Sequence, residues 1–120
     1  VYADLRGESI DFGIMERTEG IRVCPGEFGW NDVGSWAAAY ELRESTADDE
    51  KHVALADLIS VDSQGCLAWS DPKKTIALVG VNDLVVVDTE DALLICPRHR
   101  AQDVKKAVEQ LAAKKRDELL

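Results

Sequence analysis

The pattern of apolar and polar positions divides the chain into a helical zone, a strand-rich zone and a final helix. In the first zone, Ser9 stands directly before an apolar stripe that begins at Ile10, which predicts the capped start of a helix. The apolar run over 21–24 stops at a Pro-Gly pair, so a short strand is expected there. The alanine-rich stretch 35–43 predicts a second helix, because alanine has the highest helix propensity.

A charged segment without periodicity, 44–52, separates these helices from a zone of short apolar runs and indicates a linker or an exposed loop. Turn-forming residues divide the second zone into predicted strands over 55–61, 66–69, 75–81, 84–87 and 92–96. The run 84–87 is apolar at every position, which indicates strands buried between layers or wound into a solenoid. The spacing of about ten residues fits a sandwich or a β-helix-like coil, and periodicity alone does not choose between them.

The last zone has the pattern of an amphipathic helix. Apolar residues recur at helical spacing from Ala101 to Leu111, while Lys105 and Lys106 are assigned to the opposite, solvated face. A basic cluster closes the segment, as suits the negative end of a helix dipole.

Composition and charge narrow the classes of partner. The chain of 120 residues is 46% hydrophobic, as in folded globular proteins, and carries a formal net charge of −9. Such a surface repels nucleic-acid phosphates and anionic lipids, so we expect neither nucleic acid nor a membrane as partner. No apolar stretch approaches the roughly 20 residues that span a bilayer. We expect a soluble, cytoplasmic protein.

Cysteine and histidine usage points to the same compartment. The three cysteines are dispersed and odd in number, which favours buried free thiols in a reducing cytoplasm over a disulfide framework. The two histidines, His52 and His99, are far apart, lie in polar surroundings and lack a third ligand at metal spacing, so a zinc site is not expected.

The densest candidate chemistry is the segment 28–36, between the predicted strand and the second helix. It places two glycines and two tryptophans around one carboxylate: Gly29, Trp30, Asp32, Gly34 and Trp36. The glycines permit sharp backbone turns, and the tryptophans are expected to brace the loop by packing. A carboxylate held in place suits Mg²⁺, which takes one or two protein oxygens together with substrate phosphates. Alternatively, Asp32 caps the following helix or holds the turn, although Ser35 is an equally good cap.

Four segments resemble motifs of one family. Residues 8–17 resemble the SIDYGIMEK-like motif of bacterial mannose-1-phosphate guanylyltransferases, and 28–36 resemble their FGWNDVGSW loop. Residues 77–94 are similar to the family's VGVxDLVVVDTxDALL run, and 102–105 to its QxVK helix start. The resemblance covers nearly the whole chain.

This resemblance implies an enzyme that makes GDP-mannose and pyrophosphate from GTP and mannose 1-phosphate with Mg²⁺. It implies that Asp32 is the catalytic and metal-binding residue, one of two carboxylates that hold the ion. The family motifs further imply substrate-binding roles for Ser9, Asp11, Glu16, Asn31 and Gly34. For Ser9, Asp11 and Glu16, helix capping and surface solvation are the alternatives.

The implied fold is mixed α and β. Residues 1–45 would be the closing helices and active-site loop of a Rossmann-like nucleotidyltransferase domain, and 46–120 a β-rich, left-handed β-helix-like domain with a terminal helix. The family's glycine-rich GxGxR-type loop and its second metal carboxylate have no counterpart here. The chain is therefore expected to be a C-terminal fragment, inactive alone. A further departure is the 49–52 segment, where the family often has a Gly-Asn pair.

Two other interpretations stay open. One is a different sugar-1-phosphate nucleotidyltransferase, which the loop over 28–36 disfavours. The other is a non-catalytic β-domain that serves oligomerisation, for which a homodimer is the expected form.

Overall fold

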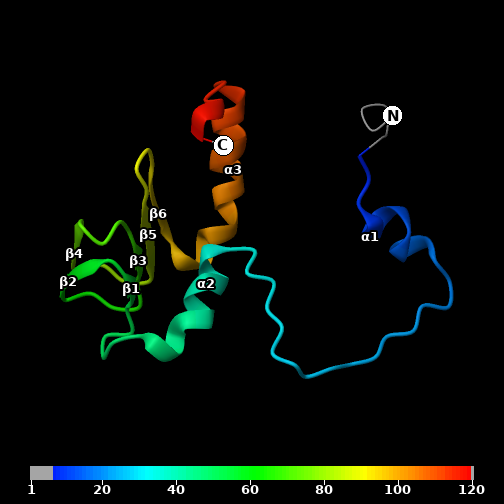
Figure 1. Cartoon of the computed structure of the whole chain (residues 1–120), viewed down its shortest axis with the longest axis horizontal. Helices are drawn as coiled ribbons and strands as arrows, with labels where there is room; N and C mark the ends of the chain where they lie inside the picture. Colours follow the sequence, from blue (N-terminus) through cyan, green and yellow to red (C-terminus); the bar gives the residue numbers. More distant parts are fainter. Residues whose placement is uncertain (1–6, 120) are drawn as a thin grey trace. The chain divides into compact units, whose positions relative to one another are not determined.

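A computed structural model describes residues 7–119, whose contacts form two compact units: one ends at Trp30 and the other begins at Asn31 (Figure 1). The first unit contains the short helix α1 (Ile10–Gly13) and a 3₁₀ turn, Met15–Arg17. As predicted, Ser9 is the N-cap of α1. The strand predicted over 21–24 is wrong: this segment has no regular structure, because no described strand pairs with its backbone.

The second unit begins with helix α2 (Trp36–Arg43), followed by a 3₁₀ turn, Glu44–Thr46. Six strands come next: β1 (Val53–Leu55), β2 (Asp57–Val61), β3 (Leu67–Trp69), β4 (Thr75–Val79), β5 (Leu84–Asp88) and β6 (Leu93–Pro97). The strand expected over 55–61 is two strands, because the chain bends at Ala56. The other four strand predictions are confirmed to within two residues at their ends.

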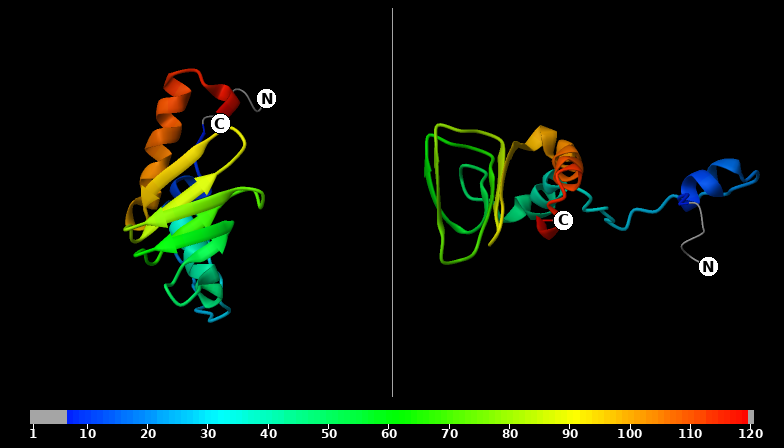
Figure 2. Two further views of the ribbon diagram at one scale, coloured as in Figure 1. Left: turned by 90° about the vertical axis from the view of Figure 1, so that its left-hand side faces the viewer. Right: turned by 90° about the horizontal axis from the view of Figure 1, so that it is seen from above.

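The strands are stacked as turns of a coil (Figure 2). Strands β1, β3 and β5 pair in parallel on one side, and β2 and β4 pair in parallel on another. A parallel bridge between Gln64 and Asn82 continues the stacking between these sides. The second turn of the coil repeats the first after 18 residues, both at Leu67/Val85 and at Asp57/Thr75. A β-helix-like coil is therefore the correct alternative and the sandwich is wrong, while the left-handed sense stays a prediction.

At two corners of the coil, residues that stack on successive turns both have left-handed backbone, with positive φ. Gly65 (φ +67°) and Asp83 (φ +51°) lie 18 residues apart on successive turns, as do Asp62 (φ +49°) and Gly80 (φ +65°). Glycine adopts this backbone without strain, and aspartate is among the side chains that tolerate it best. The corner lengths differ: one residue, Ala56, joins β1 to β2, whereas five residues, 70–74, join β3 to β4.

The coil has two apolar cores, one on each face of the β1–β3–β5 stack. Inside the coil, Cys66, Leu78 and Val86 are buried together. Outside it, Val53, Leu67, Val85 and Val87 are buried against Tyr40 of α2. The all-apolar run over 84–87 is thus explained, because Val85 and Val86 face opposite cores.

After β5 the chain reverses direction, and it continues into a helix. Strand β6 forms an antiparallel hairpin with β5, and a 3₁₀ segment, Arg98–Asp103, leads into helix α3 (Val104–Ala113) and a last 3₁₀ turn, Asp117–Leu119. The predicted helix is confirmed, but Ala101 lies in the preceding 3₁₀ segment, where it is buried. Within residues 7–119, no helix combines the length and apolar character needed to cross a membrane.

The charged segment predicted as a linker or exposed loop is tightly held at its end. The Tyr40 hydroxyl donates to the Lys51 carbonyl at 2.8 Å, and Asp48 Oδ1 accepts from the His52 N–H at 2.6 Å. Helix α2 therefore packs on the coil, and the compact unit begins at Asn31. The predicted domain boundary near residue 45 concerns the whole protein and stays a prediction.

His52 is buried, and both of its ring nitrogens have polar partners. Its Nδ1 accepts from the Cys66 N–H at 3.1 Å, so Nε2 carries the proton and donates to Ser60 Oγ at 2.9 Å. The side chain therefore ties the start of β1 to the next turn of the coil. Of the three free cysteines, Cys66 is buried and Cys96 half-buried, but Cys24 is exposed, because the strand predicted around it does not form.

Candidate functional site

The loop that carries Asp32 runs directly into helix α2. Ser35 has extended backbone and its Oγ accepts from the Ala38 N–H at 3.3 Å, which makes it the N-cap of the helix. Ser35 thus fills the capping role that was the alternative for Asp32. Asn31 and Asp32 are exposed, so the Asp32 carboxylate is free to meet a ligand.

Gly34 lies at a close approach within this loop. A Cβ at position 34 would lie 3.1 Å from the Asp32 backbone oxygen and 3.7 Å from Asp32 Oδ2. A larger residue would press on the backbone that places the carboxylate. Gly29 has a positive φ of 66°, whereas Gly34 does not, so the special backbone expected at the two glycines is present at Gly29 only.

The two tryptophans of the loop differ in their packing. The Trp36 ring is half-buried and meets Trp69 of β3 edge to face, with 5.8 Å between ring centroids and 71° between ring planes. Trp30 is 73% exposed, so the prediction that it braces the loop is wrong for the described chain. It is the last residue of the first unit and has no apolar layer over its ring.

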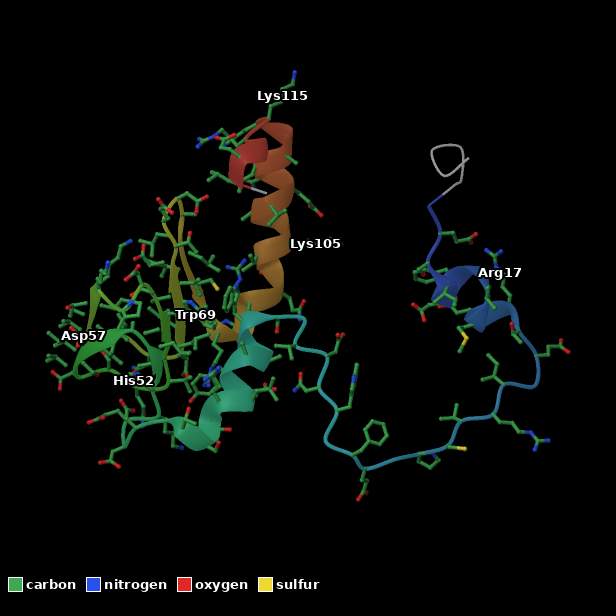
Figure 3. The ribbon with its side chains drawn as sticks, in the orientation of Figure 1. Arg17, His52, Asp57, Trp69, Lys105 and Lys115 are labelled. Atoms are coloured by element: carbon green, nitrogen blue, oxygen red, sulfur yellow. The ribbon has the colours of Figure 1, made fainter. Side chains whose placement is uncertain are left out.

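A groove of about 550 Å³ lies beside the loop, between α2, β3 and the start of α3. We call it the Trp36 groove; its lining is Val33, Gly34, Ser35, Trp36, Ala39, Trp69, Ala101, Gln102, Val104 and Lys105. Figure 3 shows Trp69 on the coil and Lys105 on α3. The loop after Asp32 therefore borders a mainly apolar surface that has a lysine on its rim.

The far half of α2 is attached to a corner of the coil. Tyr40 is only 2% exposed, and the guanidinium of Arg98 lies 3.9 Å from the centre of its ring. Arg98 Nη2 in turn forms an ion pair with Asp83 Oδ1 at 2.5 Å. Asp83 is one of the four stacked corner residues, so this chain of contacts connects the helix to the coil.

The loop around Asp32 offers a single carboxylate to a divalent ion. In the part of the chain that the structure describes, Asp32 has no ion-pair partner, and no cluster of three or more His, Cys, Asp or Glu residues is arranged to hold a metal. An exposed single carboxylate fits Mg²⁺ only when further oxygens come from substrate phosphates or from another segment. Asp32 would then be the holding residue in this chain.

The remaining predicted residues lie in the other unit. Ser9 Oγ accepts from the Phe12 N–H at 3.3 Å, and Asp11 stands in the first turn of α1. Glu16 is exposed in the following 3₁₀ turn. The capping alternative is thus realised for Ser9. Since these residues belong to a different unit from Asp32, their assembly into one site stays a prediction.

The groups whose pKa departs from its ordinary value lie outside the loop 28–36. Burial raises the pKa of the Cys66 and Cys96 thiols, which keeps both in the neutral form. Hydrogen bonds from Lys106 and Arg100 lower the pKa of Asp103. The neutral thiols of Cys66 and Cys96 therefore act as packing groups, as the sequence predicted for these two cysteines.

Sequence reasoning missed two residues beside the loop, Trp69 and Lys105. Trp69 was placed only as a strand residue, and Lys105 was assigned to the solvated face of the last helix, whereas both line the Trp36 groove. The only sequence feature that pointed to Lys105 was the match to the QxVK motif. That match did not predict that the start of α3 lies beside Ser35.

Comparison with known proteins identifies the coil. Residues 56–111 match the family described as "MannoseP isomerase/GMP-like beta-helix domain". The chain is 43% identical over 111 residues to mannose-1-phosphate guanylyltransferase ManC of Salmonella typhimurium, which covers 92% of this chain and 22% of that protein. It is 39% identical over 110 residues to alginate biosynthesis protein AlgA of Pseudomonas aeruginosa, with coverage of 92% and 22%.

A solved structure has the same fold. The crystal structure described as mannose-1-phosphate geranyltransferase from Thermus thermophilus superimposes with a TM-score of 0.73 at 34% identity, over 92% of this chain and 33% of that one. The chain thus spans less than a quarter of the two curated relatives named above.

The β-helix assignment made from the coil geometry and the resemblance carried by the loop and strand motifs now agree. This chain is similar, along nearly its whole length, to the C-terminal portion of mannose-1-phosphate guanylyltransferases, and the predicted resemblance to that family is confirmed.

Proposed function

We propose that this chain is the C-terminal part of a mannose-1-phosphate guanylyltransferase, which forms GDP-mannose and pyrophosphate from GTP and mannose 1-phosphate. The observation that carries the proposal is the 43% identity to the Salmonella typhimurium enzyme over 92% of the chain. The exposed Asp32 carboxylate, in the loop that precedes α2, supplies the chemical feature such an enzyme needs. We place the enzyme in the cytoplasm, in polysaccharide biosynthesis; the AlgA relative is named for alginate biosynthesis.

In this proposal Asp32 holds Mg²⁺ together with a second carboxylate from outside the chain. The ion, when bound, neutralises phosphate charge during transfer of the guanylyl group. The contribution of the chain is positional: Ser35 fixes the start of α2, Gly34 avoids a tight contact with the Asp32 backbone, and Asp32 faces solvent. Such transfer depends on alignment and charge more than on covalent chemistry by the protein.

The substrate-binding candidates have separate roles in the proposal. Asn31 and Gly34 flank Asp32 and are assigned to the nucleotide-sugar phosphates. Asp11 and Glu16 are exposed, and we assign them, with Ser9, to the sugar side of the cleft. Because the Ser9 hydroxyl already accepts a backbone hydrogen bond, it would donate its own hydrogen bond to a substrate.

Turnover of the full-length protein that contains this chain tests the assignment of Asp32. Asp32→Ala should lower GDP-mannose formation by several orders of magnitude, because a metal-holding carboxylate is lost. Glu41→Ala, which removes an exposed carboxylate on α2, the helix that follows the Asp32 loop, is the control and should leave turnover unchanged. A loss below about tenfold for Asp32→Ala would remove this residue from the metal site.

Two further assays test the reaction and the need for the missing part. The full-length protein should prefer GTP and mannose 1-phosphate over other nucleotides and sugar 1-phosphates; preference for another pair would favour a different sugar-nucleotide transferase. The 120-residue chain alone should make negligible GDP-mannose, and Mg²⁺-dependent turnover by it would contradict the fragment interpretation.

A second candidate function, self-association through the coil, is favoured by exposed apolar side chains on its strands. These are Ile59, Val61, Val79, Leu93 and Ile95, each between 48% and 66% exposed. We propose that they contribute to a homodimer. Light scattering should give a dimer mass that does not fall on moderate dilution; a monomer at high concentration would contradict this candidate.

A further inference from the structure

We propose that the β-helix coil sets the position of the Asp32 loop, with Trp69 and Arg98 as the positioning residues. The inference rests on the proposed function of Asp32 and adds to it a role for the coil in catalysis. It is carried by two separate contacts, one at the start of helix α2 and one a turn further along, that attach the helix to the coil.

The first contact lies at the start of α2. Trp36 is the first residue of the helix, and its ring packs edge to face on Trp69 at 5.8 Å between centroids. Trp69 belongs to β3, which is paired on both sides, with β1 and with β5. The ring is therefore carried by a central strand of the stack, and Trp36 rests on a rigid base.

The second contact lies one helical turn further along. Tyr40 is buried, its hydroxyl donates to the Lys51 carbonyl, and its ring is covered by the Arg98 guanidinium at 3.9 Å. The ion pair with Asp83 holds Arg98 at the coil corner. Since Trp36 and Tyr40 are four residues apart, they lie on the same face of the helix. Two attachments on one face prevent α2 from turning about its axis or sliding along the coil.

The loop is too short to decouple Asp32 from this helix. Three residues separate Asp32 from Trp36, so even a fully extended chain of four steps would place the two Cα atoms within about 14 Å. The Ser35 cap and the close approach at Gly34 reduce this freedom further. Catalytic groups must be held to within about 0.5 Å, and a misplacement of 1 Å can cost about a hundredfold in rate. A looser attachment of α2 to the coil should therefore also displace the Asp32 carboxylate.

The experiment compares variants of the full-length protein that contains this chain. Trp69→Ala and Arg98→Ala should each lower kcat by about tenfold to a hundredfold and raise the Mg²⁺ concentration needed for half-maximal rate, with KM for GTP changed less than threefold. Trp69→Phe keeps an aromatic edge and should restore most of the loss. Leu78→Ala is the matched control, because Leu78 is buried inside the coil and packs in the cluster away from α2. It should lower the melting temperature without changing kcat at temperatures where the protein is folded.

A second measurement does not depend on activity. The Ala38 N–H, which donates to Ser35 Oγ, reports on the helix start. Its hydrogen exchange should speed up at least tenfold in Trp69→Ala but not in Leu78→Ala. If Trp69→Ala does not fold, Trp69→Leu, which keeps apolar volume without the ring, serves for both measurements.

The outcomes are distinct. Reduced kcat with faster Ala38 exchange, rescued by Trp69→Phe, supports the inference. Trp69 and Arg98 variants that match Leu78→Ala in kcat and exchange overturn it while leaving the proposed function intact. If Asp32→Ala keeps its turnover, the proposed function fails and the catalytic part of the inference fails with it, whereas the exchange result still decides whether the coil holds α2.

Discussion

Substitution of Gly65 by alanine should destabilise the coil through one identifiable contact. Gly65 has a φ of +67°, and a Cβ there would lie 2.7 Å from Asp83 Oδ1 and 3.7 Å from Arg98 Nη2. The methyl group must therefore displace the Asp83 carboxylate from Arg98. Gly80 has nearly the same φ, +65°, but a Cβ there would meet no atom within 4 Å. Gly80→Ala is thus a control with the same backbone strain and no clash.

The size of the difference follows from these contacts. Left-handed backbone costs alanine about 1–2 kcal/mol, and its smaller unfolded-state entropy returns about 0.4–1 kcal/mol, in both variants alike. Gly65→Ala additionally loses a partly exposed ion pair, about 0.2–1 kcal/mol, and weakens the stacking of Arg98 on Tyr40, about 0.5–1 kcal/mol. We expect Gly65→Ala to be less stable than Gly80→Ala by about 1–2 kcal/mol, or at least about 4 °C in melting temperature for a unit of this size.

Urea unfolding of the two variants, followed by circular dichroism, measures the difference. The same comparison in an Asp83→Ala background should remove it, because the displaced carboxylate is no longer present. Equal stabilities for Gly65→Ala and Gly80→Ala, or an extra cost that persists without Asp83, would show that the stacked corner is not coupled to Arg98 in this way.

Three more predictions concern other parts of the chain. Lys51 has a φ of +61°, so Lys51→Gly should stabilise the protein by about 0.5–1 kcal/mol in urea unfolding, and a destabilised variant would contradict the backbone assignment. Cys24 is exposed while burial raises the pKa of the Cys66 thiol, so a thiol reagent should modify Cys24 in the native chain and Cys66 only on unfolding; equal rates would refute this. The Lys106 ammonium lowers the pKa of Asp103 from its ordinary value of 3.8, so this contribution to stability is present above pH 3.8 and is lost as pH falls through the folded pKa. The melting temperature of Asp103→Asn should therefore lie slightly below that of the unchanged protein at neutral pH and converge with it in acid; a constant gap would argue against the pairing.

The elements with strong local signals were predictable from the sequence. Ser35 followed by an alanine-rich stretch specified α2, and turn residues specified the later strands. The strand expected over 21–24 failed, because an apolar run becomes a strand only when another strand pairs with it. Pairing is a long-range property, which is also why periodicity left the sandwich and the coil undecided.

At the site, Ser35 was foreseen as a helix cap, and its hydrogen bond from the Ala38 N–H confirms this. Gly34 was foreseen as a turn residue, and this is wrong, because its φ is not positive and its close approach is to the Asp32 backbone. The contacts that hold the loop were not foreseen, because Trp36 meets Trp69 across 33 residues of sequence and Tyr40 meets Arg98 across 58. Such contacts depend on how the coil stacks. Short-range patterns carry no information about that stacking.

The unequal corners of the coil have a practical consequence for engineering. The β3-to-β4 corner holds four residues more than the β1-to-β2 corner, yet the strands on either side of both stack in register. The number of residues in a corner therefore does not determine how the strands pair. A peptide epitope or fluorescent label inserted after Lys73, which is exposed, should be tolerated.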